Sequence, residues 1–190
     1  DSRLVINMVK TAVEQGGTLL NYFKVTGLVK DKKGITGVTV VDIESNIKYE
    51  IKSKAVVNAT GAFTDSVRLM DESEINPIIV PSQGVHIVLD KSFMPGDTAI
   101  MIPHTSDGRV LFAIPWHNRV LVGTTDTPID DISLEPRPLT EEIDFLLEHA
   151  AHYLEKDPTS ADILSIFVGI RPLVDLGESE NTGEISRDHT

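Results

Sequence analysis

Five short β-strand patterns between residues 78 and 124 constrain the fold of this 190-residue chain most strongly. Gly, Pro, Asn and Asp separate them, a spacing typical of antiparallel sheets. The strand patterns lie at 78–80, 85–90, 98–103, 109–115 and 119–124. An amphipathic helix with Thr140 as its N-cap is expected over 140–156, and a last short strand over 162–168. The sequence predicts an antiparallel-rich sheet with a helix in this half of the chain.

The first 75 residues carry a different pattern. They predict a helix over 2–13, and then strands over 18–28, 35–43 and 47–51 that form two hairpins. The apolar run 55–57 is typical of a strand buried on both faces, and a small-residue turn at 58–61 and a helix at 62–70 follow it. A strand, a turn and a helix in this order bring backbone N–H groups to one point. Polar residues and Pro at 72–77 mark a candidate domain boundary.

Composition excludes several classes of function. With 17 basic against 29 acidic residues, the net charge of −12 disfavours nucleic acid and anionic lipid as partners. The absence of Cys excludes disulfides, thiolate nucleophiles and Cys-based metal sites. The longest apolar run is 110–114, far shorter than the roughly 20 residues that cross a bilayer. No transmembrane helix is expected.

Two residues are the main candidates for chemistry. Strand alternation puts Gly84, His86 and Val88 on one face, where His86 is either an ordinary hydrogen-bonded residue or a group for proton transfer. Arg171 lies between a strand and Pro172, and it is either an ion-pair partner or a receptor for a carboxylate or phosphate. The residue pattern leaves both alternatives open.

Other polar clusters favour ordinary structural roles. The hydroxyls and carboxylate at 124–126 indicate a turn with bonds from side chains to the backbone. Glu148, His149 and His152 superficially resemble a metal site, but their spacing differs from that of zinc hydrolases and favours a solvated helix flank. No metal site is expected. The chain contains neither a G-x-S-x-G nucleophile elbow nor a G-x-x-x-x-G-K-[ST] phosphate loop.

Five motifs resemble those of FAD-dependent glycerol-3-phosphate dehydrogenases, in the same order and approximate spacing. They are VVNATGA at 56–62, QGVHIV at 83–88, IPW at 114–116, GTTD at 123–126 and GIRPL at 169–173. The broader group is the D-amino-acid-oxidase-like flavoprotein superfamily. The resemblance covers nearly the whole chain. It departs at Gln83, where the family usually has a basic residue.

The resemblance implies a fold and an activity. The fold class is α+β or α/β, with an incomplete Rossmann-like FAD-binding domain over 1–75, a substrate-capping domain with an antiparallel-rich mixed sheet over 76–168, and the start of a return to the FAD domain over 169–190. The enzyme would oxidise sn-glycerol 3-phosphate to dihydroxyacetone phosphate by hydride transfer to FAD, and electrons would pass to a membrane quinone.

The resemblance also assigns site residues. His86 and Arg171 correspond to the catalytic and substrate-binding histidine and arginine of the family, and Thr125 and Asp126 to residues that line the substrate pocket. The residues expected to approach FAD are Val25, Ala59, Thr60 and Gly61.

Further expectations concern the parent protein. No G-x-G-x-x-G fingerprint occurs in the chain, so this turn is expected upstream of Asp1, and further phosphate-binding cations beyond Thr190. The chain is therefore expected to be a piece that alone binds FAD weakly or not at all and is inactive. The parent is expected in the cytoplasm, peripherally on the inner membrane through regions outside this chain. An unpaired strand edge at 55–58 would favour self-association into a homo-oligomer.

Two alternatives remain. An amine or amino-acid oxidase of the same superfamily would use Arg171 to hold a carboxylate. A binding module without a cofactor would use Arg171 only as an ion-pair residue and 58–61 only as a tight turn.

Overall fold

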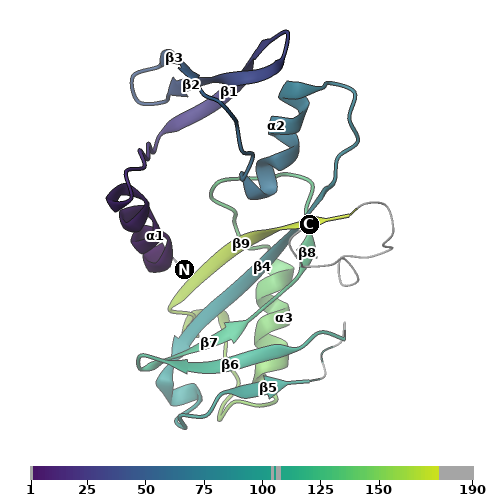
Figure 1. Cartoon of the computed structure of the whole chain (residues 1–190). Coiled ribbons are helices and arrows are strands. Elements are labelled where there is room, and N and C mark those ends of the chain that lie inside the picture. Colours follow the sequence, from purple (N-terminus) through teal and green to yellow (C-terminus); the bar gives the residue numbers. More distant parts are fainter. Residues whose placement is uncertain (1, 104, 106–107, 176–190) are drawn as a thin grey trace. The chain divides into compact units, whose positions relative to one another are not determined.

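The computed structural model describes residues 2–103, 105 and 108–175 (Figure 1). Within them the chain divides into two compact units. The first unit contains the residues up to Ala59 and Ser66–Ile75, and the second contains Thr60–Asp65 and the chain from Asn76 onward. None of the described helices is long and apolar enough to cross a bilayer.

The first unit contains a three-stranded antiparallel sheet, one complete helix and most of helix α2 (Thr64–Asp71). Its elements are α1 (Ser2–Glu14), β1 (Phe23–Asp31), β2 (Gly34–Asp42) and β3 (Ile47–Lys52), and the strand order is β1-β2-β3. The expected helix and the two hairpins are therefore confirmed, but the first strand, expected over 18–28, lies at Phe23–Asp31. The pairing aligns Val25 with Val40, and Val40 is buried.

The prediction of a strand buried on both faces at 55–57 is wrong. These residues form no strand, and Val57 is 85% exposed. A short apolar run becomes a strand only where a neighbouring strand satisfies its backbone groups, and no described strand pairs with this run. The unpaired strand edge expected to favour self-association is therefore also absent from this segment.

The helix expected over 62–70 is confirmed as a short 3₁₀ turn, η1 (Gly61–Phe63), followed by α2 (Thr64–Asp71). Asp65 in its first turn accepts hydrogen bonds through Oδ2 from the backbone N–H groups of Ile78 (3.0 Å) and Ile79 (2.9 Å). This carboxylate fixes the residues that open the main strand of the second unit.

The second unit is built on a six-stranded sheet that is antiparallel in every described pairing. Strand β4 lies at its centre and pairs with β9 on one side and with β7 and β8 on the other. Strands β6 and β5 continue outward from β7. The strands are β4 (Ile79–Asp90), β5 (Ile100–Ile102), β6 (Leu111–Trp116), β7 (Arg119–Gly123), β8 (Thr127–Pro128) and β9 (Ser165–Val174). The α+β class with an antiparallel-rich sheet is confirmed.

Strand β8 was not expected from the sequence, and two further strands differ from the prediction. The separate strands expected at 78–80 and 85–90 form the single strand β4. The last strand, expected to end at residue 168, continues through Arg171 to Val174 because β9 pairs with β4 along its whole length. Pro172 faces Pro81 in this pairing. Arg171 therefore lies inside a strand and not beyond its end.

The core of the second unit lies between the sheet and helix α3 (Thr140–Ala151), which packs along one face of the sheet (Figure 1). Strand alternation is confirmed, since Val85, Ile87 and Leu89 are fully buried on this face. From α3, the buried side chains are those of Leu146, Leu147 and Ala150.

The N-cap of α3 differs from the expectation. Leu139 holds the cap position and Thr140 is the first helical residue. The carboxylate of Glu142, the third helical residue, reaches back to accept the N–H of the cap residue Leu139 at 2.9 Å. The helix also ends at Ala151 and not at residue 156.

We predict that Ile87→Ala lowers the free energy of unfolding by about 2–5 kcal/mol, because it opens a cavity in the fully buried core. Ile114→Ala is the matched control, since Ile114 lies on the opposite face of the sheet and is 38% exposed. It should cost less than about 1 kcal/mol. Urea denaturation followed by circular dichroism measures both. Equal losses for the two variants would contradict the assignment of the core to the α3 side.

Candidate functional site

The two residues singled out in the sequence lie on the same face of the sheet, opposite α3. Ser82, Gly84 and His86 alternate along β4, and their partners on β9 are Arg171, Gly169 and Phe167 in that order. Residues directly opposite in an antiparallel ladder project to the same face. The ladder therefore brings His86 and Arg171 to one face although 85 positions separate them in the sequence.

The guanidinium of Arg171 is held by the segment 124–126. Its nitrogens donate to Asp126 Oδ1 at 3.2 Å, to Thr124 Oγ1 at 3.1 Å and to the Thr125 carbonyl at 3.2 Å. The Ser82 hydroxyl donates to the same Asp126 oxygen. A guanidinium with three acceptors from consecutive residues has a fixed orientation, and about a quarter of the side chain (27%) stays exposed.

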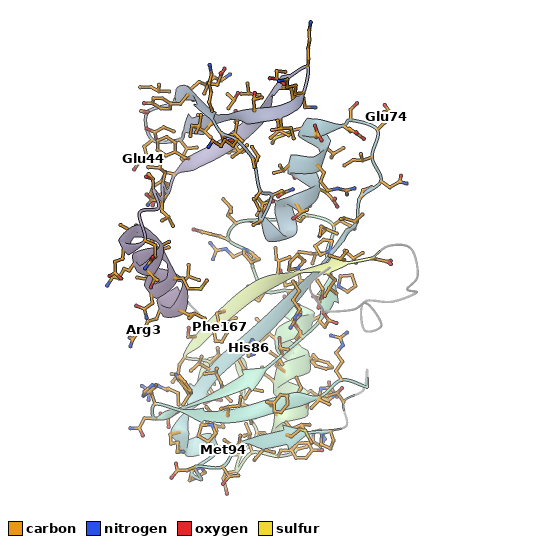
Figure 2. The ribbon with its side chains drawn as sticks, in the orientation of Figure 1. Arg3, Glu44, Glu74, His86, Met94 and Phe167 are labelled. Atoms are coloured by element: carbon orange, nitrogen blue, oxygen red, sulfur yellow. The ribbon has the colours of Figure 1, made fainter. Side chains whose placement is uncertain are left out.

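Glycine makes room for both candidate side chains. A Cβ atom at Gly84 would collide with the guanidinium of Arg171, and a Cβ atom at Gly123 would collide with the imidazole of His86. The His86 ring stacks on Phe167, with the ring centroids 4.8 Å apart and the planes at 6° (Figure 2). The absence of a side chain at these two positions is therefore a requirement of the site.

The environment of His86 favours its neutral form. Burial lowers the pKa of His86 below its ordinary value, and the positive charge of Arg171 lowers it further. A neutral imidazole at physiological pH has one ring nitrogen that can accept a proton.

The structure places the side chains of Thr125 and Asp126 on opposite faces of the sheet. The Asp126 carboxylate bonds to Arg171, whereas the Thr125 side chain lies on the α3 side of the sheet. There its Oγ1 accepts the Val85 N–H at 2.9 Å and donates to Glu142 Oε1 at 2.9 Å. Of the polar groups of Thr125, the carbonyl is the one that bonds to Arg171.

Sequence reasoning missed Gln83 and Glu142 as a pair. Both are buried, and the Gln83 amide donates to Glu142 Oε2 at 2.7 Å and to the Arg137 carbonyl at 3.0 Å. Gln83 therefore projects to the α3 side. A basic residue at this position would also project from the face of the sheet away from His86. No local pattern indicates the pair, because 59 positions separate its members.

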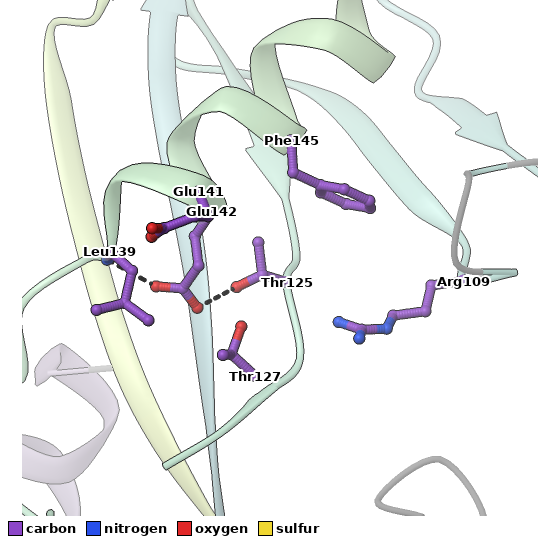
Figure 3. Close-up of a pocket in the computed structure, with 7 residues that line it drawn as sticks. All are labelled: Arg109, Thr125, Thr127, Leu139, Glu141, Glu142 and Phe145. Carbon is purple, nitrogen blue, oxygen red and sulfur yellow. Dashed lines mark hydrogen bonds between the residues drawn. The ribbon is translucent and has the colours of Figure 1, made fainter.

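A pocket of about 280 Å³ lies on the α3 side (Figure 3). Its lining residues are Arg109, Thr125, Thr127, Leu139, Glu141, Glu142 and Phe145. His86 and Arg171 do not line it. The pocket and the His86–Arg171 face are thus separate features of the second unit.

The residues expected to approach a cofactor are distributed over both units. Val25 and Ala59 belong to the first unit, and Thr60 and Gly61 to the second. Ala59 and Thr60 are exposed, and Gly61 has a φ of 57°, which favours glycine. A turn of small, exposed residues fits the close approach of a ligand to the backbone.

The expected helix flank is only partly solvated. His149 is buried, its ring lies 4.2 Å from that of Phe145, and its Nδ1 is 2.8 Å from the Phe145 carbonyl. His152 is exposed, with Nδ1 2.9 Å from the Glu148 carbonyl. Within the described ranges no three His, Asp or Glu side chains are grouped in a way that could hold a metal ion.

We predict that His86 titrates below 6.5 and that Arg171→Gln raises its pKa only part of the way back, since burial is the larger cause. As the pH falls, His86 of the unfolded chain takes up a proton before His86 of the folded chain does. The neutral His86 therefore contributes fully to folding stability above pH 6.5, and this contribution is lost as the pH falls through the folded-state pKa. NMR titration of the histidine ring protons, with His86→Gln for assignment, measures this. A pKa at or above 6.5 would contradict it.

A second prediction compares two glycines that face each other in the β4–β9 pairing. Gly84→Ala should lower the free energy of unfolding by about 1–3 kcal/mol because the new methyl displaces the Arg171 guanidinium. Gly169→Ala is the control, since a Cβ there meets nothing within 4 Å and should change stability by less than about 0.5 kcal/mol. Denaturant unfolding measures both variants, and equal effects would contradict the close contact between Gly84 and the Arg171 guanidinium.

Comparison with known proteins supports the family resemblance. The family model described as FAD dependent oxidoreductase matches residues 1–185. The probable mitochondrial glycerol-3-phosphate dehydrogenase of Caenorhabditis elegans is 40% identical over 193 residues, covering 100% of this chain and 27% of that protein. The mitochondrial glycerol-3-phosphate dehydrogenase of Rattus norvegicus is 39% identical over 197 residues, with the same coverage. The chain thus spans about a quarter of the length of these relatives.

Two solved structures resemble the structure of this chain. The glycerol-3-phosphate dehydrogenase from Bacillus halodurans, complexed with FAD, superposes with a TM-score of 0.84 at 36% identity, over 91% of this chain and 35% of that chain. The L-proline dehydrogenase from P. horikoshii superposes with a TM-score of 0.55 at 19% identity, over 86% of this chain and 41% of that chain, and indicates a shared fold only. The resemblance stated from the five motifs is confirmed: the chain belongs to the family of FAD-dependent oxidoreductases.

Proposed function

We propose that this chain is part of a flavoenzyme that oxidises sn-glycerol 3-phosphate to dihydroxyacetone phosphate. The observation that carries the proposal is the pairing of a preoriented Arg171 guanidinium with His86, an imidazole whose pKa is lowered, on one open face of the sheet. The names of the most similar relatives supply the substrate.

Arg171 is proposed to receive the phosphate of the substrate. Its guanidinium is held by acceptors on one segment, so it loses little further freedom when an anion binds. A planar guanidinium that keeps its charge at every physiological pH suits a phosphate dianion. Asp126, on the same guanidinium, fixes its direction and is proposed to shape the substrate site through Arg171.

His86 is proposed as the base that takes the proton of the substrate hydroxyl. Arg171 is excluded from this role because arginine stays protonated in proteins. The lowered pKa of His86 keeps the imidazole neutral at neutral pH, with one ring nitrogen able to accept a proton, as the role requires. FAD, when bound, supplies the acceptor for the hydride that leaves the substrate carbon.

The chain residues proposed to border FAD are Val25, Ala59, Thr60 and Gly61. The turn at 59–61 supports this assignment, because its residues are small and Ala59 and Thr60 are exposed. We propose that residues 1–75 contribute to the FAD-binding domain. We further propose that the sheet from β4 to β9 is the substrate-binding domain, whose last strand extends to Val174 beyond the expected boundary at residue 168.

The electron acceptor is proposed to be a membrane quinone, reached by the parent protein through regions outside this chain. The relatives from Caenorhabditis elegans and Rattus norvegicus are named mitochondrial proteins, which supports a mitochondrial location of the parent protein in place of the cytoplasm.

The test uses the full-length protein that contains this chain. Glycerol 3-phosphate should bleach its flavin absorbance, whereas amino acids and amines should not, and Arg171→Ala should lower kcat/KM about a hundredfold because the anion loses its charged partner. Arg119→Ala, a change at an exposed arginine of β7, is the matched control and should leave kcat/KM unchanged. The isolated 190-residue chain should retain no flavin after gel filtration.

Three results would contradict the proposal in different ways. Bleaching by an amino acid in place of glycerol 3-phosphate would favour the oxidase alternative. A full-length protein without flavin would favour the binding module. Loss of activity in Arg119→Ala equal to that in Arg171→Ala would remove the specific role of Arg171.

A further inference from the structure

Glu142 is a buried carboxylate that the proposed reaction does not use. Only 4% of the residue is exposed, at the start of α3 on the far side of the sheet from His86. Three donors satisfy it: the Thr125 hydroxyl at 2.9 Å and the Leu139 N–H at 2.9 Å, both drawn in Figure 3, and the Gln83 amide at 2.7 Å. A carboxylate so placed makes strong, charge-assisted hydrogen bonds.

Two of these bonds reach the segments that hold Arg171. Gln83 lies between Ser82, which donates to Asp126, and Gly84, whose missing side chain makes room for the guanidinium. Thr125 contributes its carbonyl to Arg171, and the residues on either side of it contribute the other two acceptors. The bond to Thr125 therefore acts on a residue whose own carbonyl accepts from Arg171. The bond from Gln83 acts between Ser82, which donates to the Asp126 partner of Arg171, and Gly84, which borders the guanidinium.

We propose that Glu142 is a positioning residue that fixes these two segments from the opposite side of the sheet and thereby aligns the Arg171 guanidinium with the phosphate of the substrate. This inference rests on the proposed function. Because neighbouring residues of an extended segment project to opposite faces, a bond on one face fixes the direction of the groups on the other.

Packing around the Thr125–Glu142 bond is incomplete, so this hydrogen bond contributes to the position of the Thr125 side chain. Thr125 and Glu142 both line the pocket of about 280 Å³, so open volume lies beside them. A side chain with open volume beside it can change rotamer when its hydrogen bond is lost. The Thr125 side chain also accepts the Val85 N–H, so its rotation would break one hydrogen bond to β4 as well as the bond to Glu142.

The test compares Glu142→Gln with Glu141→Gln in the full-length flavoprotein. Glu141 precedes Glu142 on the same helix and also lines the pocket, but it is exposed. We expect Glu142→Gln to raise the KM for glycerol 3-phosphate and the inhibition constant of inorganic phosphate about tenfold each, with kcat changed less than about threefold. Glu141→Gln should leave all three within about twofold. The phosphate constant reports anion binding independently of turnover.

A double-mutant cycle separates positioning from general stability. In an Arg171→Ala background, Glu142→Gln should produce no further change in the phosphate inhibition constant, because its effect acts through the guanidinium. A change that adds fully to that of Arg171→Ala would overturn the proposal. So would equal phosphate constants in the Glu142→Gln and Glu141→Gln proteins.

If Glu142→Gln does not fold, a second pair of variants tests the proposal. Thr125→Val removes the hydroxyl that Glu142 and Val85 share, and should raise the phosphate constant about tenfold. Thr125→Ser keeps the hydroxyl and should restore the wild-type value, and its failure to do so would overturn the proposal. A wild-type protein that does not oxidise glycerol 3-phosphate contradicts the proposed function, whereas an active wild type with an unaltered Thr125→Val variant contradicts only the positioning role.

Discussion

The antiparallel pairing of β4 with β9 is the interaction on which the rest of the second unit depends. It runs over ten residue pairs, from Ile79 with Val174 to Val88 with Ser165. This register places Arg171 opposite Ser82 and Phe167 opposite His86. A shift by one residue would turn every side chain of β9 to the other face and separate the arginine from the histidine.

The sheet formed around this pair has two chemically different faces. The face that packs on α3 buries apolar side chains together with the Glu142 network. The opposite face carries His86, Arg171 and Asp126, and several of its apolar side chains remain exposed, among them Met101, Phe112, Trp116 and Phe167. Segment 124–126 serves both faces, because its side chains and carbonyls point alternately to one and the other.

Local patterns in the sequence predicted most elements of secondary structure. The helix of the first unit, its hairpins and the buried alternation of Val85, Ile87 and Leu89 follow from periodicity within a few residues. The predictions failed where long-range pairing decides the outcome. The apolar run at 55–57 has no partner strand among the described residues, and β9 extends past Gly169 because β4 continues opposite it.

By itself the sequence determined which side chains share a face and which motifs relate the chain to flavoproteins. Both properties lie in short stretches of residues, so they can be identified without a structure. Only the tertiary structure decided that Arg171 is held by 124–126, that His86 stacks on Phe167, and that Glu142 bonds to Gln83. These contacts join residues from about 45 to 81 positions apart. Their existence depends on strand register and helix placement, which the whole chain sets when its core forms.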